Sequence, residues 1–307
     1  MKLRNILAAS AASFALFAAT PAFADGHADA AAETPLPTGS EGPALFKVAD
    51  EDTTIYLFGT VHTLPADIDW RTGPVDTAIA NSETLVTEID LTPEKMAGVA
   101  AAMQAKGTLP AGETLRGLMN EDQRATFEAG LAEVGIPAEE LDPLEPWLAS
   151  VALIQFLSQR AGFSRDRGVE NVLEGIFPEG TERVALEDVD FQISVFDETP
   201  VDQQITFLLS GAEDPLESLA ALNSIVELWS TGRLDELGDL MREGFEPLPE
   251  LGERMIYSRN ASWAEWIDAR LDDPGTVFMA VGALHLSGER NVPDLLAEQG
   301  VEVKRIQ

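Results

Sequence analysis

Residues Thr276–His285 read TVFMAVGALH and are the clearest indication of the fold in the chain. After Thr276 the run is apolar through Val281, which is typical of a strand buried on both faces of a sheet. Gly282 then allows a sharp turn as the chain leaves the strand. His285 should stand at the lip of the sheet, because ligands of α/β proteins bind in the crevice beyond the strand ends.

The same arrangement occurs near the start of the sequence. Ala44–Val48 and Thr53–Phe58 are β-rich runs on either side of an acidic turn, which predicts a hairpin. The second run leads into Gly59-Thr60-Val61-His62. Each strand therefore ends in a Gly-x-x-His segment, and the two imidazoles converge if the strands are neighbours in the sheet.

A single Gly-x-x-His segment is a weak signal, and in most proteins it is structural. Two copies are stronger because the sequence has 3 histidines in all, and the third, His27, precedes the first strand. We therefore predict one functional site that contains both His62 and His285.

Short β-rich runs alternate with helical patterns along the rest of the chain. Strands separated by helices indicate an α/β fold with a mixed central sheet and flanking helices. Residues from about 93 to 250 should form a largely helical insertion. The further expected elements are helices Pro74–Ser82, Arg254–Leu271 and Val292–Gln299, and strands Thr84–Asp90, Glu182–Glu187 and Val301–Ile306.

The N-terminus has the three-part layout of a secretory signal peptide. Met1–Arg4 is positively charged, Ile6–Ala19 is apolar and Ala22–Ala24 is a small-x-small cleavage site. We expect residues 1–24 to be removed after Ala24. A retained anchor is the weaker interpretation, because a membrane-spanning helix needs about 20 apolar residues.

Composition limits the remaining possibilities. Residues 25–43 should be a disordered leader to a single domain over 44–307. The absence of cysteine excludes a disulfide framework, a thiol nucleophile and a lipid-modified N-terminus. The net charge of −33 opposes binding to nucleic acid or to anionic membrane surfaces. Together these features predict a periplasmic or secreted protein without a membrane anchor after cleavage.

Carboxylates could complete the predicted site. Glu88 lies near the end of a strand whose apolar neighbours suggest burial, and it could be a metal ligand or a general base. Asp90 shares its alternation, so both side chains could face one side. Glu187 ends another strand and is a weaker candidate. In so acidic a chain, each of them could equally be a solvated residue.

Arg259 also stands out because basic residues are scarce. It could orient a carboxylate or stabilise an oxyanion, although a salt bridge to one of the many acids is at least as plausible. Trp263 and Trp266 are better explained as core residues than as a substrate platform. The sequence has no Gly-x-Ser-x-Gly elbow, phosphate-binding glycine loop or His-Glu-x-x-His segment.

Several segments together carry a family resemblance. They are Phe58–Pro65 (FGTVHTLP), Glu88–Asp90 (EID), Arg259–Asn260 (RN) and Val281–Gly288 (VGALHLSG), with Gly168–Glu170 (GVE) and Leu186–Glu187 (LE) between them. The chain from about residue 44 to the C-terminus resembles the TraB/GumN family, which is related to the Tiki metalloproteases and to erythromycin-esterase and ChaN-like proteins. The resemblance implies two related halves that bring the Gly-x-x-His segments together.

The resemblance also implies roles for individual residues. The Tiki branch is associated with proteolysis that depends on manganese or cobalt. Carried over, His62 and His285 become metal ligands or catalytic bases, and Glu88 becomes a ligand or base. Arg259 would then contact an oxyanion or a substrate carboxylate.

We therefore expect an exported metal-dependent hydrolase that cleaves peptide bonds in a peptide or protein substrate. The metal would activate a bound water and polarise the carbonyl. Imidazole and carboxylate ligands suit Mn, Co, Fe or Zn. Two other interpretations stay open: a haem- or ligand-binding protein, with the histidines or Tyr257 on the iron, and a non-catalytic accessory factor in envelope polysaccharide assembly or export.

Overall fold

The apolar segment that ends near His285 becomes β5, an inner strand of a mixed six-stranded sheet, in a computed structural model that describes residues 42–90 and 92–307. The strand order is β4-β3-β5-β2-β1-β6. β4, β3, β5 and β2 run parallel to one another, and β1 is antiparallel to both β2 and β6. The strands are β1 (Leu45–Ala49), β2 (Thr53–Thr60), β3 (Thr84–Thr87), β4 (Glu182–Ala185), β5 (Gly275–Gly282) and β6 (Val303–Arg305).

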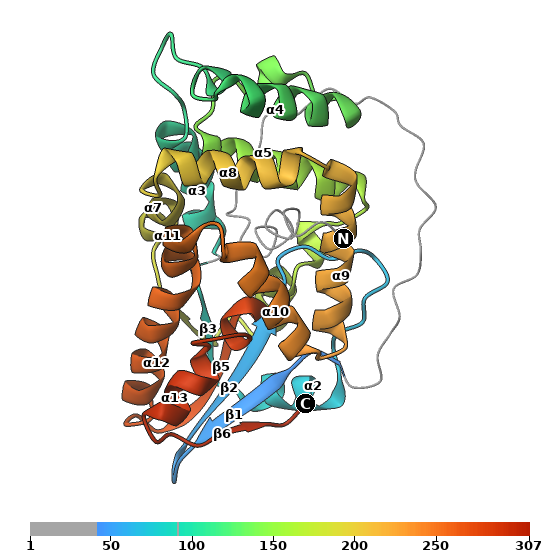
Figure 1. The fold of residues 1–307 in the computed structure, drawn as a ribbon. Helices are drawn as coiled ribbons and strands as arrows, with labels where there is room; N and C mark the ends of the chain where they lie inside the picture. Colours follow the sequence, from blue (N-terminus) through green and yellow to red (C-terminus); the bar gives the residue numbers. More distant parts are fainter. Residues whose placement is uncertain (1–41, 91) are drawn as a thin grey trace.

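Helices cover both faces of this sheet, and a larger helical part lies beyond one end of it (Figure 1). The middle of the chain is helical apart from β4, in agreement with the sequence. The helices are α2 (Gly73–Asn81), α3 (Pro93–Lys106), α4 (Glu121–Glu133), α5 (Pro146–Arg160), α6 (Val169–Ile176), α7 (Val189–Asp197), α8 (Val201–Ala212), α9 (Pro215–Ser230), α10 (Leu234–Phe245), α11 (Pro249–Gly252), α12 (Ser258–Arg270) and α13 (Val292–Glu298).

The alternation of side chains along β5 explains the two layers. Val277, Met279 and Val281 pack against α12 and α13, whereas Phe278 and Ala280 belong to the core on the opposite face. All five side chains are buried, because helices cover both faces of the sheet. A third apolar cluster, centred on α4, α5 and α8, holds the helical part together.

Several expected elements differ in detail. β4 ends at Ala185, so Glu187 lies in the loop after the strand and not at its end, and β6 is shorter than the strand expected over Val301–Ile306. The helix expected over Arg254–Leu271 is divided into a π-helical turn, Glu253–Tyr257, and α12. The strand expected over Thr84–Asp90 ends at Thr87, so the alternation that placed Glu88 and Asp90 on one side does not continue. Asp90 instead accepts a hydrogen bond from the backbone N–H of Thr92, at 2.9 Å.

The predicted signal peptide, residues 1–24, lies outside the described residues, as does the predicted leader up to residue 41 with His27. The structure agrees with the predicted α/β class and mixed sheet. A relation between two halves of the fold stays a prediction. Within the described residues, no helix is long and apolar enough to cross a membrane.

Candidate functional site

The two Gly-x-x-His segments leave the sheet side by side. β2 and β5 are adjacent and parallel, with Thr60 opposite Gly282, so the condition under which the two imidazoles converge is met. β3 lies on the other side of β5, with Thr87 opposite Ala280. Glu88, the next residue after β3, therefore emerges at the same carboxyl edge as both histidines.

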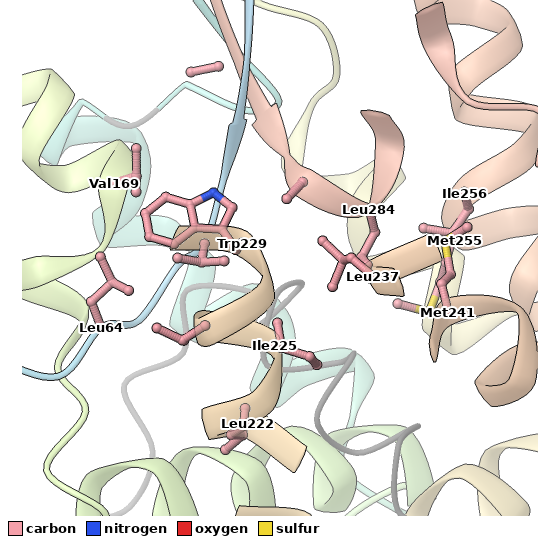
Figure 2. Packing of buried hydrophobic residues seen from close by; sticks show 14 of the residues in the cluster. Leu64, Val169, Leu222, Ile225, Trp229, Leu237, Met241, Met255, Ile256 and Leu284 are labelled. Carbon is pink, nitrogen blue, oxygen red and sulfur yellow. The ribbon is translucent and has the colours of Figure 1, made fainter. Parts of the chain in front are cut away.

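Close packing explains the glycine that begins the first segment. A Cβ atom at Gly59 would lie 3.0 Å from the Cα atom of Ala283, in the second segment. The carbonyl of Gly59 accepts a 2.7 Å hydrogen bond from the indole nitrogen of Trp229 in α9. Figure 2 shows Trp229 inside the apolar cluster beneath the site, with Leu64 and Val169 beside it.

His62 is held by a carboxylate from the helical part of the chain. Its Nδ1 atom lies 2.7 Å from Oε1 of Glu170, the second residue of α6. The hydroxyl of Thr60 donates to the same carboxylate oxygen. Burial disfavours the charged imidazolium, but the Glu170 carboxylate outweighs this effect and raises the pKa of His62.

Backbone hydrogen bonds bring these two distant segments together. Leu64 and Ser164 exchange N–H···O bonds of 3.2 and 3.0 Å, and Val169 donates to the carbonyl of Val61 at 3.1 Å. Gly168 packs directly on this loop, since a Cβ atom there would lie 2.0 Å from the carbonyl oxygen of His62. The backbone around Gly168 therefore sets where the first histidine stands.

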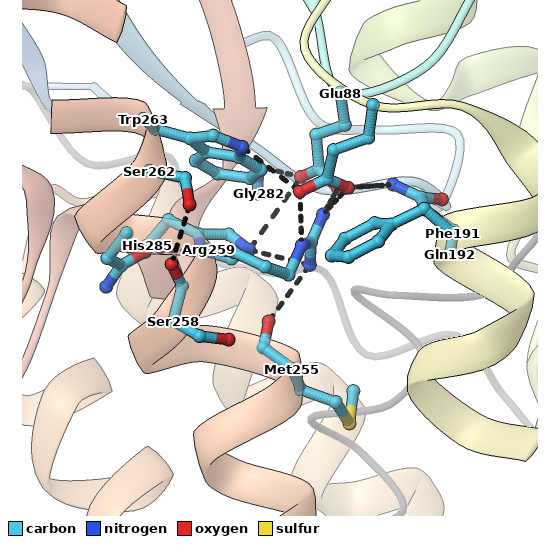
Figure 3. Close-up of polar contacts among 12 residues, drawn as sticks. Glu88, Phe191, Gln192, Met255, Ser258, Arg259, Ser262, Trp263, Gly282 and His285 are labelled. Carbon is cyan, nitrogen blue, oxygen red and sulfur yellow. Dashed lines mark hydrogen bonds and ion pairs between the residues drawn. The ribbon is translucent and has the colours of Figure 1, made fainter. Parts of the chain in front are cut away.

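Arg259 is the centre of the other half of the site (Figure 3). Its Nη2 atom donates to Oε2 of Glu88 at 2.6 Å, and its Nε and Nη2 atoms donate to the two oxygens of Glu187 at 2.8 and 2.9 Å. Nη1 donates to the carbonyl of Met255 at 2.9 Å. The side chain is only 3% exposed, so this cation is neutralised inside the protein rather than by solvent.

Glu88 is ionised in this environment. Burial alone would raise its pKa, but Arg259 above all, with smaller effects of the two histidines and of the backbone N–H of Gly282, lowers the pKa to about 2. The Gly282 N–H donates to Oε1 at 2.7 Å, and the amide of Gln192 in α7 donates to Oε2 at 3.2 Å. A carboxylate with such a low pKa is not a proton donor at neutral pH.

His285 lies deeper than His62. It is fully buried against the ring of Trp263, with the ring centroids 4.2 Å apart. Its Nδ1 atom is 2.6 Å from Oδ1 of Asn260, and its Nε2 atom is 3.2 Å from Nη1 of Arg259. Burial and the adjacent guanidinium lower the pKa of His285 well below the ordinary value, so the ring is neutral.

The remaining candidates are also placed by the structure. Glu187 is buried beneath Arg259 and accepts a 3.1 Å bond from the indole of Trp263; burial raises its pKa despite the guanidinium. Trp263 is a core residue, as expected. Tyr257 lies beneath the guanidinium of Arg290, 4.5 Å from ring centre to Cζ.

The structure thus brings His62, Glu88, Arg259 and His285 to one edge of the sheet. The carboxylate of Glu88 acts electrostatically on both histidines, so the two halves form one charged cluster. The sequence did not assign a partner to His62. A buried glutamate in the GVE segment was the available signal, but nothing local connected it to the first strand.

We tested whether the predicted ligands His62, Glu88 and His285 fit a metal ion. No three His, Asp or Glu side chains in the described part of the chain are arranged to hold one. Both ring nitrogens of His285 face protein partners, and the guanidinium of Arg259 contacts both His285 and Glu88. His62, Glu88 and His285 do not fit one shared metal ion in the present arrangement, because the guanidinium of Arg259 lies where the metal ion would have to lie. Metal binding itself stays a prediction.

The fold and the site define an α/β protein with a charged histidine cluster at the carboxyl edge of a mixed sheet. The chain belongs to the TraB/PrgY/gumN family, which matches residues 44–305 and confirms the resemblance seen in the sequence.

Two relatives illustrate the match. The uncharacterized protein YbaP of Escherichia coli (strain K12) is 22% identical over 255 residues, covering 83% of this chain and 92% of YbaP. YbaP of Shigella flexneri is 22% identical over 242 residues, covering 78% of this chain and 87% of that protein. No solved structure matches the chain.

Proposed function

We propose that this chain is an exported hydrolase in which His62 is the general base. The observation that carries the proposal is the 2.7 Å contact between His62 and Glu170 at the sheet edge. A carboxylate that holds one imidazole nitrogen sets the tautomer and stabilises the imidazolium that forms when the other nitrogen takes a proton. The side chain of His62 is 12% exposed, whereas that of His285 is not exposed at all.

The direction of proton transfer follows from the carboxylate that faces Nδ1 of His62. An ionised Glu170 can only accept, so Nδ1 of His62 carries the proton and Nε2 holds the lone pair. Nε2 would take a proton from water as the water attacks a carbonyl carbon. The imidazolium would then return this proton to the leaving amine or alkoxide as the C–N or C–O bond breaks, which restores neutral His62. The anion of Glu88 supports the positive charge that develops on His62, since it also favours the imidazolium.

Peptide-bond cleavage by a periplasmic or secreted enzyme is the specific form of this proposal. Cleavage is suggested by the resemblance to the Tiki metalloproteases, and export by the signal-like N-terminus. Dependence on Mn, Co, Fe or Zn is part of the proposal only if the site rearranges. Oxygen and imidazole donors suit these ions, but His285 would have to leave Arg259 to become a ligand. Metal analysis of the purified chain, beside the His62→Ala variant, tests this part separately.

The experiment is a screen of fluorogenic peptides and activated esters with wild type, His62→Gln and Lys304→Gln. Lys304 is an exposed residue of β6 and serves as the control. Loss of a general base lowers the rate about 10²- to 10⁴-fold. We expect that loss for His62→Gln and no change for Lys304→Gln. Hydrolysis that survives in His62→Gln would reject the proposal.

A pH profile gives a second test. The base must be neutral, so the rate should rise with pH through the raised pKa of His62. Glu170→Gln removes the carboxylate that raises this pKa, so the rising limb should move to lower pH while the maximum rate falls. A limb that does not move would show that another group controls the reaction.

The other interpretations predict different results. A haem-binding protein would show a Soret band after reconstitution, although Tyr257 lies beneath Arg290 and both nitrogens of His285 face protein groups. A non-catalytic accessory factor would show no hydrolysis, and its His62→Ala and His285→Ala variants would behave as wild type in the process it supports.

A further inference from the structure

The hydrogen bonds of Arg259 are completely used within the protein. A guanidinium has five N–H bonds and no acceptor. In this structure the Nε–H faces Glu187, the two Nη1–H bonds face Met255 and His285, and the two Nη2–H bonds face Glu88 and Glu187. No N–H of Arg259 is left over for a substrate oxyanion or carboxylate.

The tautomer of His285 follows from both of its neighbours independently. Arg259 can only donate, so Nε2 of His285 must be the acceptor of that contact. On the other side, the amide of Asn260 is oriented by the 2.8 Å bond from its Nδ2 to the carbonyl of Arg290, which can only accept. Oδ1 of Asn260 therefore faces His285, and Nδ1 of the histidine must donate to it.

Arg290, whose carbonyl accepts the hydrogen bond from Asn260, has a left-handed backbone conformation. Arg290 has a φ of 52°, which is uncommon for a residue with a side chain. Its guanidinium is paired with Glu253 at 2.7 and 3.0 Å and lies over Tyr257. These contacts stabilise the left-handed conformation that directs the Arg290 carbonyl at Asn260.

We infer that His285 and Arg259 form a closed positioning unit that holds Glu88 beside His62, and that Asn260 keeps His285 in the Nδ1–H form that the unit requires. The two histidines of the repeated segment thus have different roles: His62 exchanges a proton with the substrate side, whereas His285 accepts a hydrogen bond from Arg259 at Nε2 and donates one to Asn260 at Nδ1. This division rests on the proposed function for the role of His62, but not for the tautomer of His285.

The tautomer is measured directly by NMR of the full chain labelled with ¹⁵N-histidine at neutral pH. The sequence has 3 histidines, so His27→Gln and His62→Gln variants assign every signal. We expect a protonated Nδ1 and an unprotonated Nε2 for His285. A protonated Nε2, or rapid exchange between tautomers, would overturn the inference whatever the protein is found to catalyse.

A pair of substitutions tests the role of His285. In His285→Gln the side-chain amide reaches the position of Nε2 and its oxygen can accept from Arg259; in His285→Asn it reaches only the position of Nδ1. We expect His285→Gln to keep the hydrolytic rate within about tenfold of wild type and His285→Asn to lose more. Melting temperatures should follow the same order. Equal losses in both variants, or loss of a bound metal from both, would show that the imidazole itself reacts or binds.

Different results would contradict the proton-transfer role of His62 and the positioning role of His285. If His62→Gln keeps full activity, the proposed function is wrong, yet the tautomer result for His285 is unaffected. If instead His62→Gln is inactive while His285→Gln and His285→Asn are equally inactive, the proposed function stands and the positioning role of His285 is wrong.

Discussion

The buried carboxylate of Glu88 should make a large and pH-dependent contribution to stability. Its pKa falls from 4.5 to about 2 on folding, and each pKa unit corresponds to 1.36 kcal/mol. The ionised form therefore contributes about 3 kcal/mol to the free energy of unfolding. Because the folded-state pKa is the lower one, this contribution is fully present above about pH 4.5 and is lost as the pH falls towards 2.

Glu88→Gln is the change that measures it. We expect the variant to be about 3 kcal/mol less stable than wild type at pH 7, which agrees with the 3–5 kcal/mol typical of removing one partner from a buried ion pair. Urea titrations followed by tryptophan fluorescence give the free energy of unfolding of wild type and of the variant. The difference in free energy of unfolding between the two proteins at each pH measures the contribution of Glu88. The many other acidic residues affect both proteins alike, so their effect on acid unfolding cancels in this difference.

The control is Glu302→Gln, which removes an exposed carboxylate 3.1 Å from Lys304. Surface pairs of this kind contribute at most about 1 kcal/mol. The gap between Glu88→Gln and wild type should shrink between pH 4.5 and pH 2, and the small effect of Glu302→Gln should not mimic it. A Glu88→Gln gap under about 1 kcal/mol at pH 7, or one that persists unchanged in acid, would refute the ionised buried pair.

Two further substitutions test the backbone that supports the site. Gly168→Ala would place a methyl group 2.0 Å from the carbonyl oxygen of His62, and we expect a loss of about 2 kcal/mol or more by urea denaturation. Gly175→Ala, inside the α6 helix that Gly168 precedes and in open space, should instead gain about 0.5–1 kcal/mol. Equal effects of the two substitutions would show that the close contact is unimportant. Trp229→Phe keeps an aromatic side chain, although a smaller one, and removes the donor to Gly59; it should cost at least about 1–3 kcal/mol. An unchanged unfolding midpoint in Trp229→Phe would mean that this bond does not hold the loop.

The sheet and the place of the site could be predicted because their signals are local. An apolar run followed by glycine marks β5, and a β-rich run followed by glycine marks β2. Parallel neighbours deliver their carboxyl ends to one edge, so two matching Gly-x-x-His segments converge once the strands pair. Glu88 follows from the same reasoning, since β3 ends at that edge.

The partners of the two histidines could not be predicted, because they depend on tertiary contacts. Glu170 reaches His62 through an isolated bridge between Leu64 and Ser164, which has no periodic pattern in the sequence. The histidines also have the same local setting, yet His285 contacts Asn260 and Arg259, whereas His62 contacts Glu170. The residues that pack against each histidine come from distant segments, so the sequence around the histidine does not predict them.

The helix that carries Arg259 also differs from the sequence prediction. Apolar spacing predicted one continuous helix from Arg254 to Leu271, whereas the chain forms a π-helical turn over Glu253–Tyr257 before α12 begins. Such turns insert one residue into a helix and often occur at functional sites. The extra residue changes the direction of the side chains that follow, and the carbonyl of Met255 within the turn accepts from Arg259.

The central claim is that His62, and not His285, carries out the chemistry. The most direct measurement is the rate at which wild type, His62→Gln and His285→Gln hydrolyse the same peptide substrate under the same conditions. We predict a loss of at least about 100-fold for His62→Gln and a rate within about tenfold of wild type for His285→Gln. Full activity in His62→Gln, or an equal loss in both variants, would contradict the account.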